Sequence, residues 1–390
     1  MTDDSPTGAH LTGDHLTGDP HRQILDSLAA RGRLRALAPI AGRDFTSNDY
    51  LGLAGSPVLC AAAQDALARG VPVGAGGSRL LRGNHPEHEA LEDEAAAFFG
   101  SETALYFPTG FAANAAIAAT LPQRGDLILY DSLIHASLRA GLDPARIAAR
   151  AVAHNDAAAM EDALRQWRDA GGKGRVWIAV EALYSMDGDR APLADLVALA
   201  ARHDAMLLLD EAHATGVYGA QGRGLGAMYE GAPNIISLHT CGKALGVAGA
   251  LVCLPRLYRD VIVNRGRSFI YSTAPSPLTA AVVRAALKFC ATADSERARL
   301  QALVDRAGAA IRALGLKASG SPIQPVIVGT DAAATRLAAA LQDKGFDIRA
   351  IRPPTVPEGT ARLRIALTLN VDEIAIDALF AALAAQMVQS

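Results

Sequence analysis

The chain has 390 residues, half of them hydrophobic and 20% charged, which is enough apolar material for a large core and enough length for two or three structural units. The net charge of −3 gives no electrostatic reason to expect nucleic acid or an anionic membrane surface as a partner. No run of about 18 apolar residues predicts a membrane span. The amino terminus is polar where a signal peptide needs a basic start and an apolar stretch, and the four cysteines form no CxxC pair. We therefore expect a cytoplasmic protein without a disulfide framework.

The first segment in chain order, residues 1–45, predicts a tail and an arm. HLTGD occurs twice in tandem, at 10–14 and 15–19. These polar units have little to bury, so we predict a disordered tail, with a metal site at His10 and His15 as the alternative. From Ile24 to Leu37 the apolar residues recur at helical spacing, which predicts an amino-terminal arm helix.

The middle of the chain, residues 46–287, alternates short apolar runs with Ala-rich helical stretches. About 20–30 residues separate most of the runs, enough for a crossover helix. The pattern predicts an α/β fold with a mainly parallel sheet covered by helices on both faces. The predicted strands are 104–107, 127–130, 176–180, 206–209, 235–238 and 250–253.

The last part of the chain, residues 288–390, predicts a smaller α+β domain. Helical spacing continues from Pro277 through Phe289 to Ile311. A strand IQPVIVG (323–329), a helix near 331–344, the segment FDIRAI, the strand LRIALT and a last helix follow.

Polar side chains follow three of the predicted strands directly. They are Glu181 and Ser185 after the first, Asp210 and His213 after the second, and His239, Thr240 and Lys243 after the third. Functional groups gather at the carboxyl ends of parallel strands, so neighbouring strands would bring these side chains to one pocket.

An aspartate and a lysine in such a pocket suit pyridoxal 5′-phosphate. A buried carboxylate needs a positive partner, which a pyridinium nitrogen supplies, and a desolvated lysine amine forms a Schiff base with an aldehyde. His213 and Ser185 are placed to hydrogen-bond the ring oxygen, and His135 to stack on the ring. Gly110 and Phe111 of TGFAAN open a helix whose N–H groups suit a phosphate.

Each of these residues has a plainer explanation when taken singly. An Asp after a strand is often a helix N-cap, and a lone Lys is usually a solvated surface group. The glycines at 74–77 and the stretch GRGLG (222–226) resemble phosphate loops, but no strand leads into them, and no GxxxxGK[ST] motif occurs. The conjunction of Asp210, His213 and Lys243 therefore favours pyridoxal phosphate over a nucleotide.

Several sequence blocks carry a family resemblance from residue 43 to the carboxyl terminus. They are SNDYLGL (47–53), GAGGSRLLRGNHPEHEALE (74–92), TGFAAN (109–114), DSLIHASL (131–138), YSMDGD (184–189), LDEAHATGVYGAQGRG (209–224), TCGKALG (240–246) and IYST (270–273). With these blocks the chain resembles the α-oxoamine synthases, fold-type I enzymes that join an amino acid to an acyl thioester with loss of carbon dioxide. Within that family, 323–329 and 351–368 resemble the 8-amino-7-oxononanoate synthases of biotin synthesis.

The resemblance implies a role for each matching residue. Lys243 would be the Schiff-base lysine, Asp210 the pyridinium partner and His213 the group near the ring oxygen. His135 would stack on the ring and contact substrate, and the further cofactor ligands would be Ser185, Thr240 and the phosphate N–H donors Gly110 and Phe111. The substrate contacts would be Arg35 and Thr355, with Arg364 as the partner of the amino acid carboxylate. Glu211 and Ala214 stand where the pattern often has Asp and Gly. The Arg35 match depends on a gap before Ser47, so Arg31 and Arg33 remain rivals.

The resemblance further implies a homodimer with active sites at the subunit interface. The reaction would condense L-alanine with pimeloyl-CoA, or a pimeloyl carrier protein, to 8-amino-7-oxononanoate, carbon dioxide and free thiol. Relatives that use glycine (glycine C-acetyltransferase, 5-aminolevulinate synthase) or serine (serine palmitoyltransferase) are alternatives. From another class, the chain could be a catalytically silent homologue that binds a partner, or a cofactor-free Schiff-base lyase.

Overall fold

The computed structural model describes residues 19–37, 39–145 and 147–387. The predicted disordered tail and the candidate metal ligands His10 and His15 lie outside these ranges. Helix α1 (Pro20–Ala30) begins after Asp19, whose side chain accepts the N–H of His21. It ends before the expected limit at Leu37, because the chain adopts a left-handed conformation at Gly32, with φ 65°.

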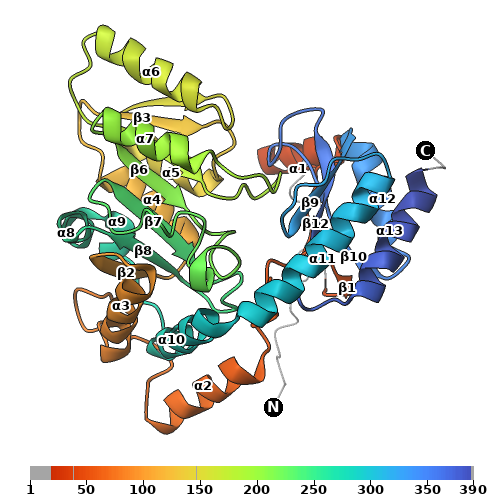
Figure 1. The fold of residues 1–390 in the computed structure, drawn as a ribbon, viewed down its shortest axis with the longest axis horizontal. Coiled ribbons are helices and arrows are strands. Elements are labelled where there is room, and N and C mark those ends of the chain that lie inside the picture. Colours follow the sequence, from red (N-terminus) through yellow and green to blue (C-terminus); the bar gives the residue numbers. More distant parts are fainter. Residues whose placement is uncertain (1–18, 38, 146, 388–390) are drawn as a thin grey trace, which may run out of the picture.

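A seven-stranded sheet forms the centre of the larger unit (Figure 1). Its strands lie in the order β2 (Thr103–Phe107), β8 (Ala250–Leu254), β7 (Ile235–Thr240), β6 (Met206–Asp210), β5 (Val176–Glu181), β3 (Leu127–Asp131) and β4 (Ala148–Val152). All neighbouring pairs are parallel except those of β8, which runs antiparallel to β2 and β7. The prediction of an α/β fold with a mainly parallel sheet is confirmed.

Six of these strands coincide with the predicted ones, and β4 was not predicted. This strand pairs only with β3, at the edge of the sheet, and four of its five residues are exposed. Its sequence, AARAV, lacks the apolar run that marks a buried strand, so the local pattern gave no signal.

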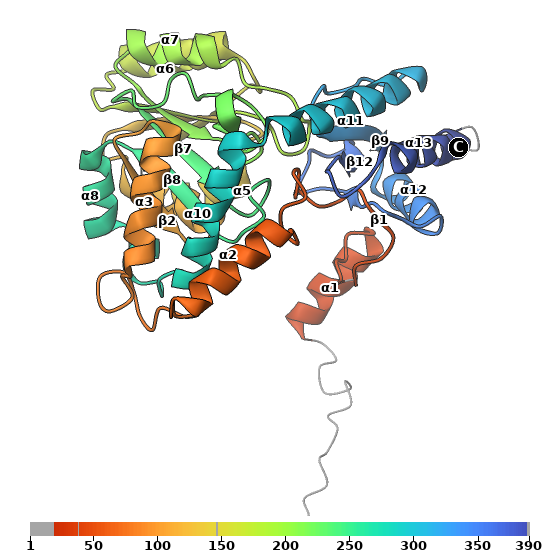
Figure 2. The same ribbon diagram turned by 60° about the horizontal axis from the view of Figure 1, so that its bottom comes forward.

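Helices cover both faces of the sheet, as predicted. One core joins a face of the sheet to α4 (Gly110–Thr120), α5 (Ala136–Ala145), α8 (Arg256–Arg265) and α9 (Arg267–Ile270). The other core joins the opposite face to α3 (Pro86–Phe99), α6 (Ala157–Asp169), α7 (Leu193–Arg202) and α10 (Pro277–Thr292). Alternate residues of a strand enter opposite cores: Leu208 belongs to the first, and Leu207 and Leu209 to the second. Figure 2 shows α3, α10 and α2 (Pro57–Ala68) on the second side.

The smaller unit contains a three-stranded antiparallel sheet in the order β11 (Ala350–Ile351), β12 (Ala361–Ala366) and β9 (Ile323–Gly329). It has its own core with α11 (Asp294–Ala313), α12 (Asp331–Gln342) and α13 (Glu373–Met387). A short strand β1 (Arg43–Asp44) pairs with β10 (Phe346–Asp347), and Phe45 lies in this core. The expected limit at residue 45 therefore falls inside the smaller unit's packing.

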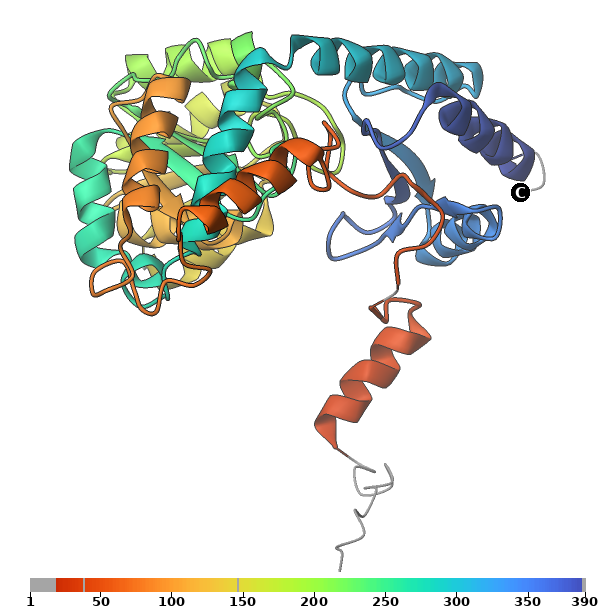
Figure 3. The ribbon, with the colours of Figure 1, turned by 90° about the horizontal axis from the view of Figure 1, so that it is seen from below.

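The junction between the two units lies at the end of α10. The expected boundary at residue 287 falls within this helix, which continues to Thr292. Ala293 separates α10 from α11, and Figure 3 shows α11 passing from the larger unit to the smaller one. We propose this break as the domain boundary. Figure 3 also shows α1 standing apart from both sheets, and none of its residues is buried. In the described part of the chain, no helix is long and apolar enough to span a membrane.

Candidate active site

A cavity of about 160 Å³ lies at the carboxyl ends of β5, β6 and β7. The register pairs Glu181 of β5 with Asp210 of β6, and Asp210 with Leu238 of β7, so the polar ends of three strands meet there. Of the residues predicted from the sequence, the cavity brings together Gly110, Phe111, His135, Asp210, His213, Thr240 and Lys243.

Lys243 lies in contact with a neutral histidine. Its Nζ is 2.7 Å from Nε2 of His213, and Nδ1 of His213 is 2.7 Å from the hydroxyl of Tyr50. Desolvation lowers the pKa of Lys243 to about 8, although Asp210 and Glu181 act in the opposite direction. Burial also keeps the pKa of His213 well below its ordinary value. An amine that loses its proton near neutral pH can act as a nucleophile or a base.

Asp210 is buried at 6% exposure and is held by two hydrogen bonds. Its Oδ2 accepts from Nδ2 of Asn114 at 2.7 Å, and its Oδ1 accepts from the N–H of Ala212 at 2.9 Å. The described chain continues after Asp210 in turns as far as the short 3-10 helix η2 (Ala220–Gly222), so this aspartate is not a helix cap. The Asp210 side chain therefore lines the cavity without capping a helix.

Glu181 is a second buried carboxyl group beside Asp210. Its Oε2 accepts the N–H of Ser185 at 3.1 Å, and its Oε1 is buried without a hydrogen-bond partner among the described residues. Burial and the nearby Asp210 raise the pKa of Glu181 to about 8. An unpaired buried oxygen costs free energy, so a hydrogen-bond donor on a ligand in the cavity would be stabilised by contact with it.

The start of α4 offers the anion site that the sequence predicted. Thr109 caps the helix by accepting the N–H of Ala112 at 3.0 Å. The first N–H groups, those of Gly110 and Phe111, have no intrahelical acceptor, as at every helix start. A Cβ atom placed on Gly110 would lie 3.6 Å from Oγ1 of Thr240, so this hydroxyl faces the same spot.

Ser185 and Arg364 lie beside the cavity rather than in its wall. Nε of Arg364 donates to the carbonyl of Ser185 at 2.6 Å, and Nη2 donates to Oδ1 of Asn48 at 2.9 Å. The charge of Arg364 lowers the pKa of both His213 and Lys243. Oδ1 of Asn48 also accepts from the hydroxyl of Tyr50 at 3.2 Å, and this hydroxyl contacts His213, so these contacts link the guanidinium to the pair of His213 and Lys243.

Arg35 and Thr355 meet at a second cavity, of about 240 Å³. Nη2 of Arg35 lies 3.1 Å from Oγ1 of Thr355. Arg33 lines the same cavity but forms ion pairs with Asp331 and Glu358, both at 2.6 Å. In the described part of the chain, Arg35 forms no ion pair, which leaves its charge available to a ligand.

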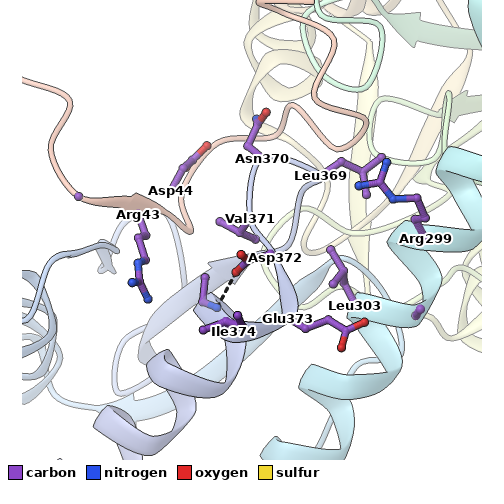
Figure 4. A pocket seen from close by; sticks show the side chains of 13 residues that line it. Arg43, Asp44, Arg299, Leu303, Leu369, Asn370, Val371, Asp372, Glu373 and Ile374 are labelled. Atoms are coloured by element: carbon purple, nitrogen blue, oxygen red, sulfur yellow. Dashed lines mark hydrogen bonds between the residues drawn. The ribbon is translucent and has the colours of Figure 1, made fainter.

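A larger cavity, of about 900 Å³, lies away from these residues, between β1, α11 and the start of α13 (Figure 4). Arg43, Asp44, Arg299 and Glu373 line it, and Asp372 caps α13 by accepting the N–H of Ala375 at 2.8 Å. None of the predicted site residues lines this cavity, so its size does not identify it as the active site.

Sequence reasoning gave no role to three polar residues of the site: Tyr50, Asn114 and Ser137. Tyr50 supports His213, and the other two line the cavity wall. Each lies inside a block that carries the family resemblance, and an Asn in an Ala-rich helix was the strongest available signal. Tyr50 and Asn114 have partners in distant segments, and Ser137, which contacts His135 two residues away, reaches Asn114 across 23 residues, so local patterns could not show these longer contacts.

The side chains present fit pyridoxal phosphate. The cavity combines a low-pKa lysine amine, a buried aspartate for a pyridinium nitrogen, and a helix start for a phosphate. The unpaired oxygen of Glu181 and the exposed ring of His135 leave contacts for a ligand to make.

Comparisons with known proteins identify the family of the chain. Residues 43–383 match the model of the aminotransferase class I and II family. The 8-amino-7-oxononanoate synthase of Anaeromyxobacter dehalogenans is 43% identical over 93% of this chain and 94% of its own, and that of Chromobacterium violaceum is 44% identical over 86% of each. Among solved structures, Sphingomonas wittichii serine palmitoyltransferase matches with a TM-score of 0.85 at 26% identity, covering 95% of this chain and 98% of that one. The Francisella tularensis 8-amino-7-oxononanoate synthase matches with 0.75 at 28%, covering 89% and 98%. The chain therefore belongs to the aminotransferase class I and II family and, within it, to the 8-amino-7-oxononanoate synthases.

Proposed function

We propose that the protein is a pyridoxal-phosphate-dependent 8-amino-7-oxononanoate synthase of biotin biosynthesis. It condenses L-alanine with a pimeloyl thioester, releasing carbon dioxide and the free thiol. The observation that carries this proposal is the meeting of Lys243, His213 and Asp210 in one cavity, in a chain 43% identical to a synthase of that name.

The cofactor would be held by residues that already face the cavity. Lys243 would bind it covalently, Asp210 would pair with the ring nitrogen, and His135 would lie against the ring. The phosphate would take the N–H groups of Gly110 and Phe111. Thr240 and His213 would add hydrogen bonds from the cavity wall, and Ser185 would add one from beside the cavity. When bound, pyridoxal phosphate supplies an electron sink for negative charge at the substrate Cα.

Lys243 would also move the proton. With a pKa near 8, its amine can take the Cα proton of alanine and return a proton later. His213 lies at 2.7 Å and, supported by Tyr50, fixes the direction of the amine. Because His213 is neutral, it does not compete for positive charge at this position.

Two arginines would hold the two carboxylates of the substrates. Arg364 would bind the alanine carboxylate, because a planar guanidinium matches a carboxylate and this one is linked through Asn48 and Tyr50 to His213, the neighbour of Lys243. Arg35, with Thr355, would bind the far carboxylate of the pimeloyl chain. The acyl group would arrive on coenzyme A or on a carrier protein.

Glycine- and serine-using relatives are the second candidate function. The TM-score with serine palmitoyltransferase exceeds that with the solved 8-amino-7-oxononanoate synthase, 0.85 against 0.75. Sequence identity favours the opposite choice, because it is 43% with the Anaeromyxobacter dehalogenans 8-amino-7-oxononanoate synthase and 26% with serine palmitoyltransferase. Side chains rather than the backbone select the substrate, so we give the identity more weight.

We further propose a homodimer. Large apolar side chains are exposed at the cavity, where Phe111 is 54% exposed, and on two segments joined by the Ala274 N–H to Gly77 carbonyl hydrogen bond, where Tyr271 (76%), Leu81 (84%) and Val73 (66%) are exposed. Ser268 ties α9 to α4 through the carbonyl of Ala112, which brings Tyr271 to this side. A second copy would cover such a surface. The four cysteines are free thiols, and we propose the cytosol as the location.

One substrate screen tests the function. Purified protein with pyridoxal phosphate is offered alanine, glycine or serine against pimeloyl, acetyl, succinyl and palmitoyl thioesters, and free thiol is followed. We expect alanine with the pimeloyl thioester to react fastest. Equal use of acetyl or palmitoyl thioesters would overturn the proposal. A protein that stays colourless with added cofactor would exclude the whole enzyme class.

A further inference from the structure

Two polar side chains of the cavity wall, Asn114 and Ser137, have no role in the function proposed above. They are buried, at 5% and 1% exposure. Asn114 lies in the second turn of α4 and Ser137 near the start of α5. Both stand between Asp210 and His135, two residues that would contact the cofactor at different places.

A continuous chain of hydrogen bonds joins these four residues. Nδ2 of Asn114 donates to Oδ2 of Asp210 at 2.7 Å and to Oγ of Ser137 at 3.0 Å. Oγ of Ser137 lies 2.7 Å from Nδ1 of His135. The chain therefore runs from the end of β6, through the first turns of α4 and α5, to the loop after β3.

The direction of each hydrogen bond follows from the atoms involved. An ionised carboxylate only accepts, so the Asn114 atom that faces Asp210 is the amide nitrogen. This nitrogen donates its second hydrogen to Ser137, whose oxygen must therefore accept. The hydroxyl hydrogen of Ser137 is then available to Nδ1 of His135.

Nδ1 of His135 receives a second donor as well. The backbone N–H of Ser137 points to it at 3.2 Å, and a backbone N–H can only donate. A ring nitrogen that accepts hydrogen bonds cannot carry a proton. The surroundings, chiefly desolvation, also lower the pKa of His135, with Lys243 and Arg139 acting in the same direction and Asp210 against it. The ring is thus neutral, and its hydrogen is on Nε2.

We propose that Asn114 and Ser137 are positioning residues that tie Asp210 to His135 and hold His135 as the Nε2–H tautomer, a hydrogen-bond donor on its cavity side. The inference rests on the proposed function, because a ligand in the cavity is what uses Asp210 and His135 together. Asn114 restrains the carboxylate, and Ser137 restrains the plane of the imidazole. A ring-shaped ligand in the cavity would then contact Asp210 and His135 as two side chains held by one hydrogen-bond network, not as two side chains that move independently.

Cofactor affinity is the first test. Ser137→Ala removes the hydroxyl but keeps the backbone N–H, and we expect the dissociation constant for pyridoxal phosphate to rise roughly five- to tenfold. It is measured by titrating the apoprotein and following visible absorbance. Asn114→Ala removes two donated hydrogen bonds and should raise the constant further. The double variant should show less than the sum of the two effects, because both changes break the same chain.

The tautomer of His135 is the second test. Histidine labelled with ¹⁵N distinguishes Nδ1–H from Nε2–H by NMR, and the His135 signal is assigned by its loss in His135→Gln. We expect Nε2–H in the wild-type holoenzyme and a detectable Nδ1–H population in Ser137→Ala. A wild-type His135 with its proton on Nδ1 would overturn the proposal.

Ser237→Ala is the matched control. Oγ of Ser237 lies 2.9 Å from Nε2 of His239, and this buried pair packs against Phe99, away from the cavity. We expect a lower Tm with unchanged cofactor affinity. If Ser137→Ala also changes only Tm, the role of Ser137 is structural and the inference fails. If the wild-type protein does not bind the cofactor, the proposed function fails, and the tautomer measured on that protein still decides this inference.

Discussion

Nζ of Lys243 and Nε2 of His213 lie 2.7 Å apart, although the two residues belong to different strand ends. Burial keeps the pKa of His213 well below its ordinary range, so this imidazole is neutral. Desolvation lowers the pKa of Lys243 to about 8. The amine can therefore lose or gain a proton near physiological pH while a neutral neighbour holds its direction. This property is what a lysine needs to act in turn as nucleophile and base.

Lys243→Ala should abolish the covalent cofactor link. Without the amine, borohydride has no Schiff base to trap, and turnover should fall by at least about 10²–10⁴ because the general base is lost. Mass spectrometry of the reduced protein checks the site of labelling. Lys288→Ala is the control, since that side chain is 70% exposed and pairs with Glu94 at 3.7 Å. Label found on another lysine of the wild-type protein would refute the assignment.

Asp210→Asn separates a cofactor role from a purely local one. The amide can still accept the N–H of Ala212, so the turn after β6 should survive. The amide introduced by this change carries no negative charge to hold a ring proton on the cofactor. Toward Nδ2 of Asn114 it would present either an NH₂ group, which cannot accept, or an amide oxygen, which is a weaker acceptor than a carboxylate. We expect cofactor to remain bound while turnover falls by about two decades or more, a loss of ~2.7 kcal/mol in transition-state stabilisation. Near-normal turnover would show that Asp210 only shapes the turn.

Arg35→Ala and Arg33→Ala should have opposite profiles. Among the described residues, the guanidinium of Arg35 contacts Thr355 but forms no ion pair. Arg35→Ala should therefore raise the KM for the pimeloyl thioester by about one to two decades. It should also reduce the preference of the enzyme for dicarboxylic over plain acyl chains. Arg33 is engaged with Asp331 and Glu358, so its loss should lower Tm and leave acyl selectivity intact. Steady-state kinetics and thermal melts distinguish them. An acyl effect in Arg33→Ala or Arg31→Ala alone would show that the arm was matched to the wrong residue.

His154 should make stability depend on pH in the alkaline range. Its ring lies 2.9 Å from Asp131 and 2.8 Å from Asp189, and these carboxylates outweigh desolvation to raise the pKa of His154 to about 10. A raised folded-state pKa gives a stabilisation that is complete below the unfolded-state value and is lost as pH rises through the folded-state value. The free energy of unfolding of the wild type should thus fall between about pH 6.5 and 10. His154→Gln should flatten this dependence in urea titrations, and an unchanged slope would contradict the ion pairs.

Local sequence patterns were enough to identify the residues at the strand ends. Apolar runs followed by Glu181, Asp210 and Lys243 predicted one pocket, because parallel strands place their carboxyl ends at the same edge of a sheet. The order of local patterns along the chain is enough to predict this pocket, and it is also enough to predict the confirmed α/β fold. The same local patterns did not reveal β4, because this exposed edge strand has no run of apolar residues in its sequence.

Which charged groups form ion pairs, and which do not, depends on the packing of distant segments and could be seen only in the folded structure. The sequence could not distinguish the three arginines of the arm as substrate contacts. Arg33 is engaged in ion pairs with Asp331 and Glu358, which lie 298 and 325 residues further along the chain. The link from Asn114 to Asp210 spans 96 residues in the same way. Hydrogen bonds and ion pairs depend on distances of about 3 Å. Local periodicity fixes which residues share a face of an element, but only the packing of distant segments brings two atoms to that distance.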